Sequence, residues 1–216
     1  MEFMGPSAAD FDNVASLNRG FLVLLRRAPG RCLTGLRADL AQRLRGLSAH
    51  EAERLAPAPF LLMSFRERDS RFWEAAFARH ANPDLFGTDA PGDVARLIVG
   101  GLGFLWQLAR HNPYAARLVS GAGLHWCEQL TELPFLHLSG FAAFGDELLR
   151  LRAAADGELW SKLVSSGVSH EEHVRRAAHI SALHTVLTRP SPAAARALPA
   201  AACATRAPSL QVADEG

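Results

Sequence analysis

The sequence has few of the residues and motifs that would assign it to a common class of protein. Cysteine is rare: Cys32, Cys127 and Cys203 are an odd number in 216 residues, and they have no C-x-x-C spacing. That pattern indicates neither a disulfide framework nor a zinc site built from thiolates. No secretory signal is recognisable, so we expect the chain in a reducing cytoplasm.

Long hydrophobic runs are also missing. The most apolar stretch, residues 97–106, is about half of the roughly 20 residues that a membrane helix needs. It contains three glycines, so we expect it in a protein core and predict no membrane partner. Charge is balanced, with 23 basic residues against 22 acidic ones and Lys162 as the only lysine. A formal net charge of +1 leaves binding to nucleic acid open.

The signature motifs of common enzymes are absent as well. The sequence has no G-x-S-x-G, no P-loop and no G-x-G-x-x-G. Cys127 follows His125 by two residues, a pairing that suits a nucleophile and its base. Cys127 also suits the role of a small buried hydrophobe, and we favour that interpretation. We therefore predict a protein without catalytic residues and without cofactors.

What the sequence does contain is a motif that recurs. The pattern E-x-L-x-x-x-P-F-L-x-x-S occurs at residues 53–64 and again at 128–139. A Gly-Phe-Leu segment precedes each copy, at residues 20–22 and at residues 103–105. Two motifs that recur in the same order indicate the duplication of a helical unit. The alternative is that leucine-rich amphipathic helices align by chance.

Each Pro-Phe-Leu segment is predicted to begin a helix, because proline has no N–H and its φ is preset near the helical value. The two segments are Pro59, Phe60 and Leu61, and Pro134, Phe135 and Leu136. After Pro59 the apolar residues continue at helical spacing, and Glu67 is expected to pair with Arg71 on the outer face. The duplication predicts that both segments bury their aromatic rings in one interior.

Further helices have capping signals. Asp93 would cap a helix through Leu108, and Asn112 with Pro113 would begin a short helix that Gly121 ends. Ser169 and Glu172 have the spacing of a capping box. No segment has the alternation of a β-strand over more than a few residues. The aromatic residues lie mostly at helical spacing and are predicted to pack in the core.

These observations predict an all-α fold, a helical bundle with an internal duplication. We divide the chain into a disordered N-terminus (1–9), helical repeat 1 (10–80), helical repeat 2 (93–152), a C-terminal helical extension (157–188) and a disordered, Ala- and Pro-rich tail (189–216).

One stretch near the C-terminus is similar to a regulatory motif. Leu163-Val164, Gly167-Val168-Ser169, Glu172, Arg175-Arg176 and Ile180-Ser181 resemble the LuxR-type helix-turn-helix. The resemblance implies that base edges would be contacted by Ala182, His184, Thr185 and Thr188, and phosphates by Arg175, Arg176 and Arg189. One extra residue precedes Ile180 and Pro190 follows soon after it, so a single helix from His170 to Leu187 is the alternative.

A second stretch, residues 46–69, is similar to the helical D subunit of the bacterial flagellar master regulator. The likeness depends on Gly46-Leu47-Ser48, Glu53-x-Leu55-Ala56 and Phe60-Leu61-Leu62-Met63-Ser64-Phe65. That subunit forms a dimer that works with a DNA-binding partner subunit. The resemblance therefore implies a protein partner or a homodimer.

Histidines supply a competing hypothesis. His170, His173 and His184 would share one face of a helix, where imidazoles bind metals. Solvated or helix-capping histidines are the ordinary explanation, and no H-E-x-x-H motif is present.

Together these patterns favour a non-catalytic bacterial regulatory or adaptor protein that acts through helical surfaces, including transcriptional regulation with DNA as a ligand. The alternative is a helical protein that encloses a small ligand or a metal ion, using His125 or the three histidines above.

Overall fold

The computed structural model describes residues 5–27, 32–78 and 92–188. Its α-helices are α1 (Ala8–Arg27), α2 (Ala38–Arg45), α3 (Ala49–Leu55), α4 (Ser70–Ala78), α5 (Asp93–His111), α6 (Pro113–Ser120), α7 (Leu124–Glu132), α8 (Gly157–Ser165) and α9 (Glu172–Thr188). Two 3₁₀ helices, η1 (Phe135–Glu147) and η2 (Ser166–Val168), follow α7 and α8. The strands β1 (Met63–Ser64) and β2 (Arg150–Leu151) pair antiparallel. The mostly helical fold that the sequence predicts is confirmed, with this short sheet added.

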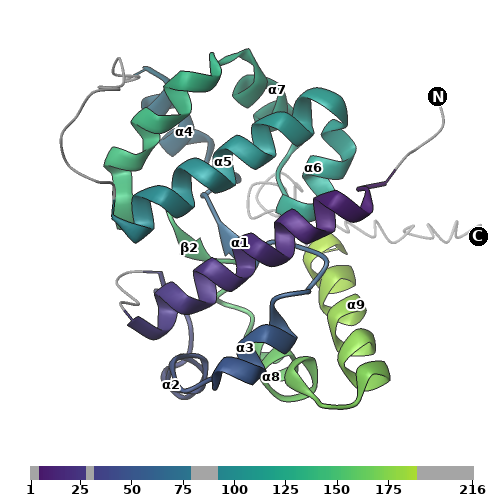
Figure 1. Cartoon of the computed structure of the whole chain (residues 1–216). Coiled ribbons are helices and arrows are strands. Elements are labelled where there is room, and N and C mark those ends of the chain that lie inside the picture. The colour runs from purple at the N-terminus through teal and green to yellow at the C-terminus, as the bar shows by residue number, and fades with distance from the viewer. Residues whose placement is uncertain (1–4, 28–31, 79–91, 189–216) are drawn as a thin grey trace, which may run out of the picture.

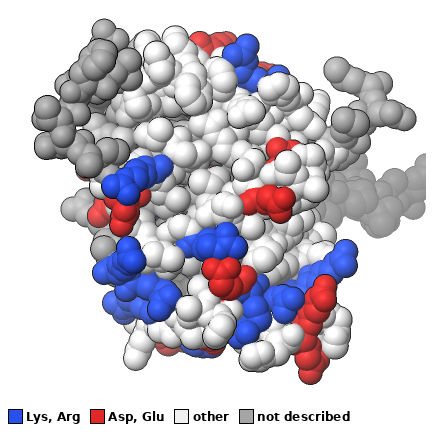
Figure 2. Space-filling view, in the orientation of Figure 1, with Lys and Arg blue, Asp and Glu red and all other residues white. Residues whose placement is uncertain are grey.

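Helix α1 crosses the front of the molecule (Figure 1). In that view α4 to α7 lie above it, whereas α2, α3, α8 and α9 lie below it, and the strands lie between the two groups. One continuous core joins both groups, and it includes Trp160 of α8 and Val186 of α9. Charged side chains on this face gather over and below α1, and the area over the middle of α5 is largely uncharged (Figure 2).

The structure does not show the predicted duplication. Three helices precede each Pro-Phe-Leu segment, α1 to α3 and α5 to α7, but the segments themselves differ. Pro59 begins no helix, and Phe60 and Leu61 are fully buried in an irregular stretch that leads into β1. Pro134 does precede a helix, η1, yet Phe135 and Leu136 are 53% and 55% exposed. The prediction that both segments begin helices with equally buried rings is wrong.

After the last bonds of α3, which Ala56 and Ala58 donate to Ala52 and Leu55, the chain as far as Leu62 is held in the core by other elements that bond to its backbone. The Asn18 amide nitrogen in α1 donates to the carbonyls of Ala56 and Phe60 at 3.0 and 2.9 Å. Its oxygen accepts from the Leu62 N–H at 2.8 Å. The Leu61 N–H donates to the Val119 carbonyl at 2.9 Å. Buried peptide groups are therefore satisfied, which is the condition for burying an irregular segment.

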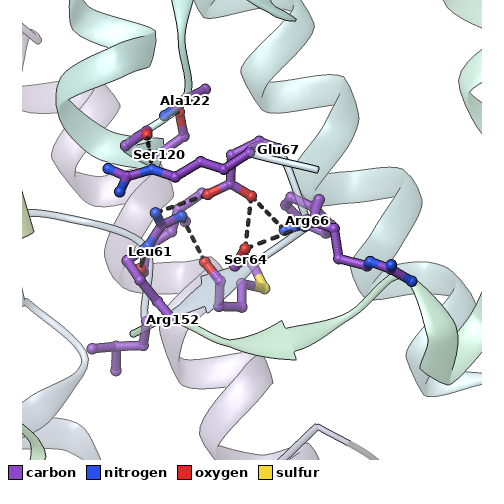
Figure 3. Close-up of polar contacts among 12 residues, drawn as sticks. Leu61, Ser64, Arg66, Glu67, Ser120, Ala122 and Arg152 are labelled. Atoms are coloured by element: carbon purple, nitrogen blue, oxygen red, sulfur yellow. Dashed lines mark hydrogen bonds and ion pairs between the residues drawn. The ribbon is translucent and has the colours of Figure 1, made fainter. Parts of the chain in front are cut away.

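A buried ion pair continues this arrangement (Figure 3). Arg152, just after β2, contacts the Glu67 carboxylate at 2.9 Å, and both side chains are at least 94% buried. Arg152 also donates to the carbonyls of Leu61 and Met63. Burial lowers the pKa of Arg152, and the Glu67 carboxylate opposes that shift.

Glu67 is held in turn by donors from its own turn. One of its oxygens accepts from the Ser64 hydroxyl and from the Phe65 N–H, both at 2.8 Å. The expected pairing of Glu67 with Arg71 on an outer helical face is therefore wrong. Helix α4 begins at Ser70 instead of Pro59, and the Asp69 side chain caps it by accepting from the Phe72 N–H at 3.1 Å.

Several sequence predictions of helix ends are confirmed. The Asn112 side chain accepts from the Ala115 N–H at 3.0 Å, Pro113 is the first residue of α6, and Gly121 ends it with φ +67°. Helix α5 is capped by Gly92, so Asp93 is its first residue and not its cap. Ser7 and Asp10 cap α1, which begins at Ala8 and corrects the predicted disorder at residues 8 and 9. The predicted disordered tail (189–216) lies outside the described residues.

The aromatic residues mostly pack as predicted. The ring of Trp73 lies 5.1 to 5.3 Å from those of Phe77, Trp126 and Phe141, which joins α4, α7 and η1. Among the described residues, Phe135 and Tyr114 are exceptions and are 53% and 49% exposed. None of the helices that the structure describes combines the length and the hydrophobicity of a membrane span.

The buried ion pair predicts a large loss of stability when one partner is neutralised. Glu67→Gln leaves the Arg152 guanidinium uncompensated in the core, so we expect the free energy of unfolding to fall by about 3–5 kcal/mol. The matched control is Glu53→Gln, because Glu53 pairs with Arg19 at the surface. That change should cost less than about 1 kcal/mol. Urea denaturation measures both, and equal losses would contradict the assignment.

Two neighbouring glycines of α5 predict opposite effects of the same substitution. A Cβ at Gly101 would overlap the buried Phe65 ring, whereas a Cβ at Gly100 would only touch Leu17 at 3.9 Å. We expect Gly101→Ala to destabilise the protein by about 1–3 kcal/mol through overpacking. Gly100→Ala should stabilise it by up to about 1 kcal/mol through helix propensity. Thermal unfolding compares them; a stabilised Gly101→Ala would show that α5 does not pack on Phe65 in this way.

Candidate functional site

The residues predicted to bind DNA lie on one uninterrupted helix. Helix α9 runs through Ile180 and Ser181 without the turn that a LuxR-type motif requires there, so it is a single helix. It begins at Glu172 and not at His170, and the Ser169 hydroxyl accepts from the Glu171 N–H, so the predicted capping box with Glu172 is not formed. Ala182, expected at a base edge, is 2% exposed and packs into the core. Thr185 is half-buried and its hydroxyl donates to the Ser181 carbonyl.

The remaining members of that set face different surroundings. Arg175 donates to the Ser169 carbonyl at 2.9 Å. Arg176, His184 and Thr188 are exposed. Arg189 lies outside the described residues. The structure therefore leaves Arg176, His184 and Thr188 on an accessible surface and places Arg175 in a structural bond.

The histidines of the metal hypothesis are not brought together. The His170 ring lies 3.5 Å from Arg54, and His173 lies 3.4 Å from Glu171. His184 follows His173 by eleven residues on the same helix, which corresponds to about 16 Å. Within residues 5–27, 32–78 and 92–188, no three His, Cys, Asp or Glu side chains are arranged to hold a metal ion.

Cys127 is a buried hydrophobe, as the sequence predicts. It is fully buried in α7, and burial raises the pKa of its thiol to about 11, so the thiolate is disfavoured. His125 is exposed on the same helix. The arrangement does not activate Cys127 as a nucleophile.

An exposed cluster that the sequence did not predict lies where η1 meets α5. It comprises Trp106, Arg110, Phe135 and Leu136, which we call the aromatic patch. The rings of Trp106 and Phe135 are 5.3 Å apart with edge-to-face geometry, and Arg110 lies 4.7 Å over the indole of Trp106. The Trp106 N–H donates to the Leu133 carbonyl at 2.9 Å, which fixes the ring. The patch combines two exposed apolar side chains with a rigid aromatic base.

The surface also has two grooves that are separate from the aromatic patch. One, between α1 and α5, has a volume of about 480 Å³ and is mostly apolar. We call it the α1–α5 groove; it is lined by Ser16, Leu17, Arg19, Gly20, Val23, Leu24, Arg27, Asp93, Arg96 and Leu97. The other, between α8 and α9, is polar, and its lining balances Arg37 and Lys162 against Asp156 and Glu158. The balance gives the second groove no preference for ligands of one charge.

The buried side chain of His179, to which the sequence analysis assigned no role, holds α9 in place. His179 is 5% exposed and its Nε2 lies 3.0 Å from the Gly167 carbonyl, so the neutral ring donates to η2. Gly167 lies against the ring, where a Cβ would approach it to 3.4 Å. Burial lowers the pKa of His179, and the hydrogen bond to Gly167 opposes that shift.

This histidine predicts acid sensitivity of the packing of α9. Because its folded pKa lies below the ordinary value of 6.5, the unfolded chain binds the proton more tightly. Stability is therefore complete above pH 6.5 and falls as the pH drops through and below that value. His179→Gln retains a donor without titrating, so we expect the wild type to lose more stability than this variant between about pH 7.5 and 5.5. Parallel pH profiles of denaturation would contradict the assignment.

Comparisons with known proteins yield no family for the chain. No protein-family model, no curated protein and no solved structure matches it. The resemblances at residues 46–69 and 163–188 therefore stay predictions, and the aromatic patch and the α1–α5 groove supply the basis for a functional assignment.

Proposed function

We propose that this chain is a non-catalytic regulatory or adaptor protein that binds a partner protein through the aromatic patch. One observation carries the proposal: Phe135 and Leu136, consecutive in η1, each expose more than half of their surface, and the Phe135 ring lies 5.3 Å from the ring of Trp106. Adjacent exposed large apolar residues on a rigid base are typical of a binding site. The other exposed large hydrophobic residues of the described chain, such as Tyr114 and Ile180, are not adjacent in sequence to Phe135 and Leu136.

The composition of the patch matches that of interaction hot spots. Trp and Arg are among the residues that contribute most to protein interfaces, and aromatic residues are enriched there. Trp106 is fixed by its bond to Leu133 and Arg110 is stacked on it, so little side-chain freedom is lost on binding. Covering the exposed halves of Phe135 and Leu136 would contribute about 2 kcal/mol from burial of apolar area.

A protein partner is favoured over direct DNA contact by charge. The first part of α9 and the residue before it carry Glu171, Glu172, Arg175 and Arg176, so acidic and basic groups balance. Binding to DNA depends on an excess of cations that neutralise phosphates. In the regulatory form of the proposal the partner contacts the DNA, which is what the resemblance of residues 46–69 to a flagellar regulator subunit implies.

The patch predicts that binding is lost when Phe135 is made polar. Phe135→Ser removes an exposed ring and should leave the fold intact, so we expect at least a tenfold loss of partner recovered from extracts of the native host. The matched control is Ile180→Ser, which removes an equally exposed apolar side chain from α9. Affinity capture with quantitative mass spectrometry compares both variants with the wild type.

Two outcomes would overturn the proposal. One is that Phe135→Ser recovers the same partners as the wild type. The other is that the purified chain alone shifts specific DNA in a salt-dependent manner, which would assign regulation to direct DNA contact.

A further inference from the structure

The α1–α5 groove lies between two antiparallel helices. Gly20 of α1 faces Leu97 of α5, and Leu17 faces Gly100, so the chain directions are opposed. Both helices lie toward the viewer in Figure 1, and Figure 2 shows the charged side chains of the same face.

The floor of the groove is apolar. It is formed by Leu17, Val23, Leu24 and Leu97, of which Leu17, Val23 and Leu97 are half-buried. Gly20 is exposed on this floor, and a Cβ there would reach Leu97 at 3.4 Å. The missing side chain leaves room for another element to approach the backbone of α1.

The rim of the groove is cationic. Arg19, Arg27 and Arg96 line it against a single acid, Asp93. Arg19 is bonded to Glu53 at 2.8 and 2.9 Å, and Arg96 lies 3.6 Å from Asp93. Arg27 is exposed and forms no ion pair with another residue that the structure describes. The excess positive charge is therefore concentrated at the end of the groove where α1 finishes.

The shape of the groove suits a helix. Leu17, Gly20, Leu24 and Arg27 follow one another at three- and four-residue spacing, so they form a straight stripe along α1. The lining runs from Ser16 to Arg27, which corresponds to about 16 Å or three helical turns. An apolar groove between two helices is the surface into which amphipathic helices dock.

We propose that the α1–α5 groove binds an acidic amphipathic helix of a partner protein, about three turns long, with its apolar stripe on Leu17, Gly20 and Leu97 and a carboxylate on Arg27. Charge complementarity selects this occupant: carboxylates beside the stripe meet the arginine rim, and a basic helix is repelled.

This site is independent of the aromatic patch. Leu97 and Trp106 are nine residues apart on α5, so at about 100° per residue they lie on opposite flanks of its buried face. The inference therefore goes beyond the proposed function, since a chain with both surfaces holds two partner elements at once.

The test uses two synthetic peptides on the full-length chain. Both carry the same leucine stripe over about 14 residues and an outward hydrocarbon staple; one has Glu flanks and the other Lys flanks. By fluorescence anisotropy at about 0.15 M salt, where charges outside the groove are screened, we expect the Glu peptide to bind at least about tenfold more tightly than the Lys peptide. Arg27→Glu should weaken the Glu peptide by about tenfold and strengthen the Lys peptide.

The matched control is Arg26→Glu, because Arg26 is equally exposed and next in sequence but does not line the groove. It should change either affinity by less than about threefold. Phe135→Ser should leave peptide binding unchanged, which separates this site from the aromatic patch. Three outcomes would each overturn the proposal. The two peptides could bind equally, the substitutions at Arg26 and Arg27 could have equal effects, or sedimentation could show a dimer that Arg27→Glu dissociates.

Discussion

Asn18 and Arg152 supply the polar partners that allow residues 56–67 to cross the core in a largely non-helical conformation. The Asn18 side chain bonds to three backbone groups of this segment. The Arg152 side chain bonds to two of its carbonyls and to Glu67, and the Arg152 N–H donates to a third carbonyl, that of Leu62. Without such partners the buried peptide groups would each cost free energy comparable to a lost hydrogen bond. The segment, in turn, carries Phe60, Leu61 and Phe65 into the space between the two groups of helices. Arrangement of the helices around this centre therefore depends on polar groups that are completely buried.

Much of the helical framework was predictable because its signals are local. Asn112, Pro113 and Gly121 define α6 by the chemistry of its two ends, and helical spacing identified the apolar faces. The identical Pro-Phe-Leu segments misled the prediction, because a proline suits both the first turn of a helix and an extended stretch. What separates them is distant in sequence: Asn18, Val119 and Arg152 reach the first segment, whereas the second meets the outer flank of α5. Glu67 was misplaced for the same reason, since its partner is 85 positions away.

The aromatic patch and the α1–α5 groove both exist because only one face of α5 is buried. Its inward residues, including Ile98, Leu102 and Leu105, form one face of the helix, and the two flanks of that face stay accessible. One flank carries Trp106 beneath Phe135, and the other borders the groove with α1. Neither surface was visible in the sequence, because each joins residues from elements far apart in the chain. The histidine pattern and the LuxR-like pattern, by contrast, could be recognised in the sequence, but the structure does not form the sites that they predict. Helix α9 separates His173 from His184 along its length, and it continues through Ile180 without a turn.

Amide hydrogen exchange at Leu61 and Leu62 tests the central claim most directly. These amides bond to the Val119 carbonyl and to the Asn18 side chain inside the core. The account predicts that they exchange as slowly as the core amides of α5, through global unfolding alone. A helix that began at Pro59 would leave the Leu61 amide in its first turn without an intrahelical partner, whereas Leu62 would be the first residue to have one. Fast exchange at Leu61 would therefore contradict the account.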